Sequence, residues 1–157
     1  MKRFFYIALS AILFWTCGEE FQPDNPLDPE NPEYIPPFVT ITDGPQDGST
    51  VSSSSVDFEW DGNEPAMTFR YRLDDEIWSA WMSLKSTTFN YLDEGDYTVS
   101  VQGQYTTSDT SEVVSSSFTV DAVSGSAIRF YRLYTEAGLG DQITLDIYAE
   151  EVVNLAG

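Results

Sequence analysis

Between residues 38 and 121, apolar side chains alternate with polar ones in short runs that Gly, Asp and Asn residues separate. In one such run, Val56, Phe58 and Trp60 alternate with acidic residues. Period-two alternation places every second side chain on the same face of a strand, so the run predicts a strand with one buried face. The other runs cover residues 38–41, 67–73, 89–91, 97–101 and 118–120. We therefore expect an all-β domain over residues 38–121, with seven strands at the spacings of a β-sandwich.

A linker of small residues, 122–127, leads to two further alternating runs. They extend from Ala127 to Thr135 and from Gln142 to Ala149, and Gly138–Asp141 between them predicts a turn. Two strands rarely fold alone, so we expect residues 128–157 to be the truncated start of a second β domain in a longer protein. On this interpretation, isoleucine and leucine side chains and unpaired strand edges are left exposed. The alternative is that these strands add to the preceding sandwich.

The pattern is different near the start of the chain, where Lys2 and Arg3 precede an apolar run from Phe4 to Trp15. About a dozen apolar residues suffice for an export signal, whereas a membrane span needs roughly 20. The only cysteine of the chain, Cys17, follows this run. Residues 1–20 resemble bacterial lipoprotein precursors, which implies that residues 1–16 are a cleaved signal peptide and that Cys17 is acylated. An ordinary signal peptide or a short membrane anchor is the alternative.

Residues 18–20, Gly-Glu-Glu, resemble the acidic tract that directs some bacterial lipoproteins to the outer face of the outer membrane. The resemblance implies a lipid-anchored envelope protein, surface-exposed or periplasmic. Six of the eight prolines then fall within residues 21–37. Because proline fixes its own φ and favours an extended residue before it, residues 17–37 predict a stiff, polyproline-like linker with no fold of its own. At about 3.1 Å per residue, it would hold a domain roughly 50 to 60 Å from the membrane.

Composition excludes several functions. The formal charge is −19, and cleavage after Thr16 would leave about −21, so no basic patch is expected that could bind nucleic acid or anionic lipid headgroups. The chain has no histidine, and Cys17 is its only thiol, which excludes Ser-His-Asp and Cys-His catalysis and intramolecular disulfides. A sandwich of this size is also expected to have no cleft for a pair of hydrolytic carboxylates. We therefore expect no enzyme activity and no cofactor.

One motif of the sandwich region is specific. Leu92, Gly95 and Tyr97 have the spacing of a tyrosine corner, in which the tyrosine hydroxyl bonds to the backbone a few residues upstream. With Trp60 on an early strand and no cysteine pair, residues 38–121 resemble a fibronectin type III or bacterial Ig-like domain. The stretch 71–81, continuing to 95–97, is also similar to Ig-like repeats of bacterial extracellular sensors. Such domains serve as spacers or as adhesion and recognition modules.

Trp78 and Trp81 are the candidate ligand-binding residues, since two tryptophans near a loop can form a platform for a sugar or a peptide. The alternative is structural, with one tryptophan on the core and the other over its edge. Arg70 and Arg72 project from the opposite face to Phe69 and are expected to stack on or pair with neighbours. The acidic stretches 74–76 and 93–96 lack the spacing of an EF-hand and predict solvated turns, with no metal site.

Residues 140–147 and 154–157 resemble the opening of a cohesin-type domain, a module of carbohydrate-active surface assemblies. The sequence as a whole predicts a non-catalytic envelope lipoprotein for adhesion, scaffolding or protein interaction, with a dockerin-like protein or a glycan as partner. One alternative is a carbohydrate-binding accessory protein that uses Trp78 and Trp81. The other is the N-terminal part of a larger envelope hydrolase.

Overall fold

A computed structural model describes residues 24–153 of the chain. The chain divides into two compact units, Met1–Pro36 and Pro37–Gly157. The described part is all-β, with strands and no helix. The strands are β1 (Val39–Asp43), β2 (Ser49–Val51), β3 (Val56–Gly62), β4 (Thr68–Leu73), β5 (Ser86–Phe89), β6 (Gly95–Gln104), β7 (Val114–Val120), β8 (Ala127–Tyr131) and β9 (Asp146–Glu150). The predicted fold class is thus confirmed. The first region contains seven strands, as expected, although one of them, β2, lies in no predicted run.

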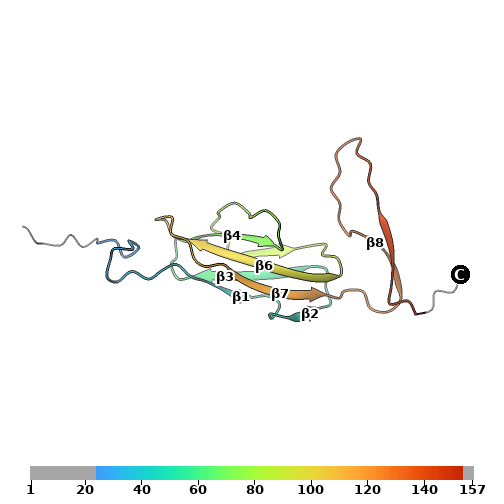
Figure 1. The fold of residues 1–157 in the computed structure, drawn as a ribbon, viewed down its shortest axis with the longest axis horizontal. Coiled ribbons are helices and arrows are strands. Elements are labelled where there is room, and N and C mark those ends of the chain that lie inside the picture. The colour runs from blue at the N-terminus through green and yellow to red at the C-terminus, as the bar shows by residue number, and fades with distance from the viewer. Residues whose placement is uncertain (1–23, 154–157) are drawn as a thin grey trace, which may run out of the picture. The chain divides into compact units, whose positions relative to one another are not determined.

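Strands β1 to β7 form two facing sheets (Figure 1). One has the order β1-β3-β5 and is antiparallel. The other has the order β2-β7-β6-β4, in which β2 runs parallel to β7 and the other neighbours are antiparallel. The alternating apolar side chains of both sheets meet between them. The largest fully buried ones are Phe58, Trp60, Phe69, Val99, Val101, Phe118 and Val120.

Aromatic contacts join the two sheets across this core. Phe58 of β3 lies 5.7 Å from Phe118 of β7, between ring centroids, and Trp60 of β3 lies 5.4 Å from Tyr71 of β4. The Trp60 indole N–H donates to the carbonyl of Leu84 at 3.1 Å, which satisfies the one polar atom of a buried ring. The alternation of acidic and aromatic residues in β3 therefore corresponds directly to an exposed and a buried face.

The first strand changes sheets in a way that the alternation does not reveal. β1 pairs with β3, and after a turn β2 pairs with β7 of the other sheet. Gly44 lies at this switch with φ of 139°, and a Cβ there would lie 2.7 Å from the ring of Phe58. Because β2 is only three residues long and mostly polar, no apolar run predicts it.

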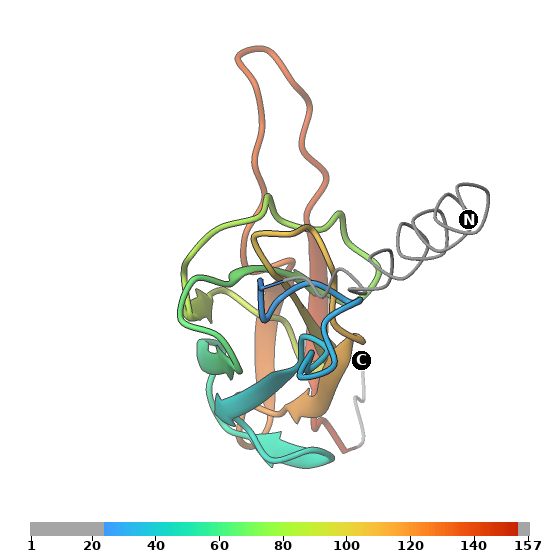
Figure 2. The same ribbon diagram turned by 90° about the vertical axis from the view of Figure 1, so that its left-hand side faces the viewer.

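Strands β8 and β9 form a separate antiparallel sheet, so the alternative in which they join the sandwich is wrong. Both strands are shorter than predicted, and a long loop, drawn in orange in Figure 2, connects them. The predicted turn at Gly138–Asp141 is present, with the Asp141 N–H donating to the Gly138 carbonyl at 3.2 Å. Tyr91 also lies outside its predicted strand, because β5 ends at Phe89.

The prediction of an extended linker without structure is wrong for residues 25–34. Here Asn25, Asp28 and Asn31 each precede a proline, and each carbonyl accepts a hydrogen bond from the N–H three residues later, at 2.9 to 3.0 Å. Each side-chain oxygen also accepts the N–H two residues later. The prolines set φ for the turn, and the Asx side chains close it. The segment is a series of three Asx-Pro turns, which rise less per residue than polyproline.

Candidate functional site

Cys17, the predicted lipidation site, lies outside the described residues, as do residues 1–16 of the predicted signal peptide. Within residues 24–153 we find no helical segment with the length and hydropathy of a membrane span. The same residues contain no group of three or more His, Cys, Asp or Glu side chains placed to hold a metal ion. The functional surfaces described below are therefore those of the sandwich and of the β8–β9 hairpin.

The tyrosine corner has the predicted geometry. The Tyr97 hydroxyl donates to the carbonyl of Asp93, four residues upstream, at 3.1 Å. Leu92 is buried, and Gly95 takes a φ of 140°, which a side chain would disfavour. Burial and then the nearby Asp93 carboxylate raise the pKa of Tyr97 above its usual value, so the phenol remains a donor. This bond fixes the backbone of Asp93 at the end of the sandwich.

The Asp93 carboxylate, in turn, contacts the hairpin. Its Oδ1 accepts from Nη1 of Arg129 at 3.3 Å and from the N–H of Leu133 at 3.0 Å. Arg129 also pairs with Glu150 across the hairpin, and this hydrogen bond is the main reason why the pKa of Arg129 is raised. The three side chains are only 12 to 20% exposed. The network therefore docks β8–β9 on the sandwich through charges that are largely shielded from water.

Trp78 and Trp81 lie on the segment between β4 and β5, which runs beside β4. The Phe69 N–H donates to the carbonyl of Met82 at 2.7 Å, and the Ser79 N–H donates to that of Tyr71 at 2.9 Å. These bonds hold both tryptophans next to the outward-facing arginines of β4. We call the four side chains Arg70, Arg72, Trp78 and Trp81 the Trp–Arg cluster.

In this cluster the guanidinium groups stack on the indole rings. Arg70 lies 4.7 Å from the ring centroids of both tryptophans, and Arg72 lies 4.9 Å from that of Trp78. Arg70 also donates twice to the Oε1 of Gln102, at 3.0 and 2.6 Å. Both rings are half-buried, and neither belongs to the core, so the predicted packing of one tryptophan on the core is wrong. The predicted stacking of the arginines is confirmed.

The acidic stretches bond to the protein's own backbone and side chains. Oδ1 of Asp74 accepts the Thr98 N–H at 2.7 Å, and Oε1 of Glu94 accepts the N–H groups of Ala122 and Val123 at 3.0 Å. Oδ1 of Asp96 accepts from the Thr119 hydroxyl at 2.6 Å. These contacts are those of turns and strand ends, as the sequence predicts.

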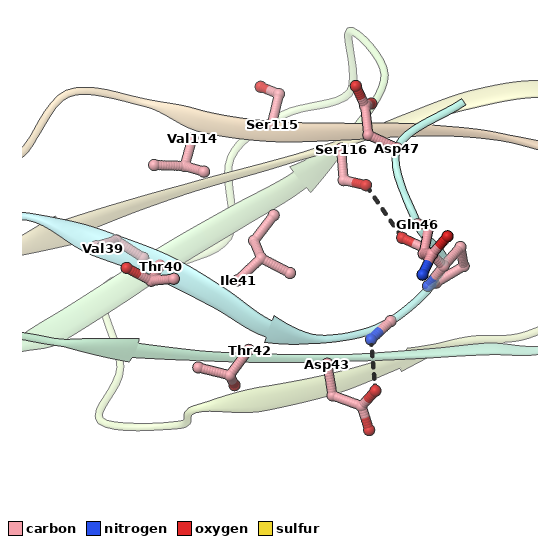
Figure 3. A pocket seen from close by; sticks show the side chains of 12 residues that line it. Val39, Thr40, Ile41, Thr42, Asp43, Gln46, Asp47, Val114, Ser115 and Ser116 are labelled. Carbon is pink, nitrogen blue, oxygen red and sulfur yellow. Dashed lines mark hydrogen bonds between the residues drawn. The ribbon is translucent and has the colours of Figure 1, made fainter. Parts of the chain in front are cut away.

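Two surface clefts of the described residues involve the sandwich. An open cleft of about 560 Å³ lies between β1 and the first half of β7, where the two sheets leave a seam (Figure 3). Ile41 points into it, and Ser116 closes one end by donating to the Pro45 carbonyl at 3.3 Å. The seam exists because β2 pairs only with the second half of β7. A second cleft, of about 500 Å³, lies where the sandwich meets the hairpin.

The hairpin has one polar face and one apolar face. Arg129 and Tyr131 project toward the sandwich side, whereas Ile128, Phe130 and Ile147 project from the other face and are 78, 59 and 67% exposed. In the pairing register, Phe130 lies opposite Ile147, and Ile128 lies opposite Ala149. These four residues, which we call the apolar hairpin face, form a contiguous patch with no covering layer among the described residues.

Arg129 is the main residue that sequence reasoning missed. The sequence does mark this residue, since Arg129 is the one cation within the alternating run 127–131 of an acidic chain. Its partners could not be identified, because Asp93 is 36 positions away. Comparisons give no further guide, as the chain matches no protein-family model and no curated protein.

Proposed function

We propose that this protein is a non-catalytic, lipid-anchored module of the bacterial cell envelope that binds another protein. The observation that carries the proposal is the apolar hairpin face. Contiguous exposed apolar side chains rimmed by polar ones mark interaction surfaces, whereas single exposed apolar residues do not. Arg129 supports the same function, since its ion pair with Asp93 holds this face on the sandwich and its ion pair with Glu150 joins the two strands of the hairpin.

The architecture supports a role in display. A tyrosine corner and two packed sheets of seven strands in total are features of fibronectin type III and Ig-like sandwiches, which act as spacers and recognition modules. We therefore propose that residues 38–121 belong to that group. The cohesin-like character of the hairpin region belongs to the same proposal, with a dockerin-like surface protein as partner and adhesion or scaffolding as the biological role.

Anchoring follows from the start of the sequence. Acylation of Cys17 would fix the chain to the outer membrane, because each buried methylene contributes about 0.8 kcal/mol and a mature lipoprotein carries several chains. Incorporation of radiolabelled palmitate in cells tests this step. We expect labelling of the wild-type chain and none of Cys17→Ala, and an unlabelled wild-type chain would contradict the anchor.

The interaction surface is tested by site-specific crosslinking in intact cells. A photoreactive phenylalanine analogue replaces Phe130 on the apolar hairpin face, and in a matched control it replaces Thr106, which is exposed on the β6–β7 loop. We expect one discrete protein adduct from position 130 and none from position 106. Adding Ile128→Asp should abolish the adduct. No adduct at either position, or equal adducts at both, would overturn the proposal.

Glycan binding by Trp78 and Trp81 is less well supported. A sugar ring stacks on an aromatic face, but guanidinium groups already occupy faces of both indoles. Arg70 would have to leave Gln102 and both rings to expose them. We therefore infer that the Trp–Arg cluster stiffens the outer face of the sandwich.

A further inference from the structure

The second cleft, of about 500 Å³, is formed by the end of β4, the β5–β6 loop and the start of the loop after β8. Four tyrosines line it: Tyr91, Tyr97, Tyr131 and Tyr134. We propose that this tyrosine cleft binds a neutral saccharide. The proposal goes beyond protein binding by the apolar hairpin face, and it uses different residues.

The aromatic rings offer the flat surface that a sugar needs. Tyr91 of the sandwich and Tyr134 of the hairpin region stack on each other, with centroids 5.4 Å apart and planes 17° apart. The stack occupies one face of each ring, and the two residues are 61 and 55% exposed, so the part of each tyrosine outside the stack remains open to the solvent. A pyranose has an apolar C–H face of comparable size, and its burial against a tyrosine ring is favourable.

Polar groups around the rings match the hydroxyls of a sugar. Asp74 and Glu76 line the cleft as acceptors, and Arg132 and Asn90 line it as donors. The side-chain oxygen of Asn90, Oδ1, accepts from the Ser55 hydroxyl at 2.7 Å. The side-chain amide nitrogen of Asn90 is not used in that bond and can serve as a donor to a ligand. A few polar groups that converge on an aromatic surface are the usual composition of a small-molecule site.

The charges of the cleft favour a ligand without net charge. An acidic sugar would meet Asp74 and Glu76 in a chain of net charge −19. A cation would meet Arg132 on the same wall, and Arg129 already neutralises the third carboxylate, Asp93. A neutral saccharide avoids both penalties and can use the acceptors and the donors together.

The backbone of the cleft is held in an uncommon conformation. Tyr91 has a φ of 60° and Asp74 a φ of 48°, in the left-handed region that non-glycine residues seldom adopt. For a bulky tyrosine this conformation is costly, and such residues concentrate at ligand-binding positions. In this conformation the chain leaves the line of β5 at Tyr91, and the Tyr91 ring stacks on that of Tyr134. The docking of the hairpin through Arg129 completes the wall.

The test is titration of the full chain in detergent with neutral hexasaccharides, followed by NMR of labelled tyrosines. The probes are cellohexaose, xylohexaose and mannohexaose, with a galacturonic acid oligomer and choline chloride as charged controls. We expect at least one neutral probe to bind and to shift Tyr91 and Tyr134. Tyr134→Ala should weaken binding about tenfold, and Tyr134→Phe, which keeps the ring, should weaken it much less.

Trp78→Ala is the matched control, because it removes an aromatic ring outside the cleft, and it should leave the affinity unchanged. Circular dichroism of each variant establishes that it is folded. No binding of any neutral probe at 10 mM, stronger binding of either charged control, or equal loss in Trp78→Ala would overturn the proposal. Because the apolar hairpin face is not altered, these outcomes do not depend on the crosslinking result.

Discussion

In β3, Val56, Phe58 and Trp60 alternate with acidic residues, and in β8, Ile128 and Phe130 alternate with Arg129 and the strand ends. The first three side chains are 0 to 6% exposed, whereas Ile128 and Phe130 are 78 and 59% exposed. The same period of two thus gives a strand in both regions and a core in only one. Alternation determines which side chains share a face, but burial requires a second layer opposite that face.

The two regions are consequently stabilised by different forces. The sandwich buries aromatic rings between two sheets. The hairpin is instead joined to the sandwich by the ion pair of Arg129 with Asp93, and its two strands are joined by the ion pair of Arg129 with Glu150. An isolated two-stranded hairpin is at best marginally stable in water. We therefore expect truncation of apolar side chains to unfold the sandwich and removal of one cation to release the hairpin.

The largest difference is expected between two phenylalanines. Phe58→Ala removes a fully buried ring that contacts Phe89 and Phe118, and should lower the free energy of unfolding by about 3–5 kcal/mol. Phe130→Ala removes an exposed ring and should change it by less than about 0.5 kcal/mol. Denaturant unfolding of the full chain measures both. Similar losses of unfolding free energy in the two variants would mean that another part of the protein covers the apolar hairpin face.

Some strands of the sandwich follow from the local sequence pattern, whereas others depend on pairing with distant strands. The alternating runs were sufficient to locate β3, β4, β6 and β7 and their buried faces, because period-two burial is a local property. Strand β2 has no such pattern, since its position depends on pairing with β7. Proline alone does not predict the Asx-Pro turns, because the side chains of the Asn and Asp residues before the prolines close them.

The candidate sites also divide into one that is local in the sequence and others that depend on tertiary contacts. The tyrosine corner is local, spanning Asp93 to Tyr97, and its spacing predicts the bond that the structure contains. The surroundings of Trp78 and Trp81 depend on the side-chain directions of β4. The tyrosine cleft joins residues some 40 positions apart, Tyr91 and Tyr134, which no local pattern relates.

The next largest effect should come from Arg129→Met, which keeps the length of the side chain and removes its charge. Asp93 and Glu150, largely shielded from water, would lose their shared cation, which should destabilise the docked hairpin by about 1–3 kcal/mol. Hydrogen exchange of the β8 and β9 amides should accelerate about tenfold to a hundredfold, while that of β3 and β6 stays unchanged. Arg132→Met, an exposed neighbour, is the control, and unchanged β8 exchange would refute the role of Arg129.

A smaller effect is expected from Tyr97→Phe, because Asp93 serves both regions. Its carbonyl accepts from Tyr97 and its carboxylate from Arg129. Loss of the hydroxyl should lower the free energy of unfolding by about 0.5–1.5 kcal/mol and loosen the hairpin as well. Tyr71→Phe, a ring also packed on core aromatics, is the matched control. Equal effects of the two variants would indicate that the Tyr97 bond has no special role.

The smallest effect should come from the ion pair of Lys85 with Asp61, at 2.6 Å, which contrasts with that of Arg129 because its side chains are 46 and 56% exposed. The hydrogen bond from Lys85 lowers the pKa of Asp61 below its usual 3.8. The pair therefore stabilises the fold above about pH 4, and this contribution is lost as the pH falls through the lowered pKa. Asp61→Asn should differ slightly from wild type at pH 7, less so in 1 M salt, and the difference should vanish in acid. Glu59→Gln, on the same exposed face of β3, should show no such salt-dependent difference. A loss in Asp61→Asn as large as in Arg129→Met would contradict the inference that shielding from water separates the two ion pairs.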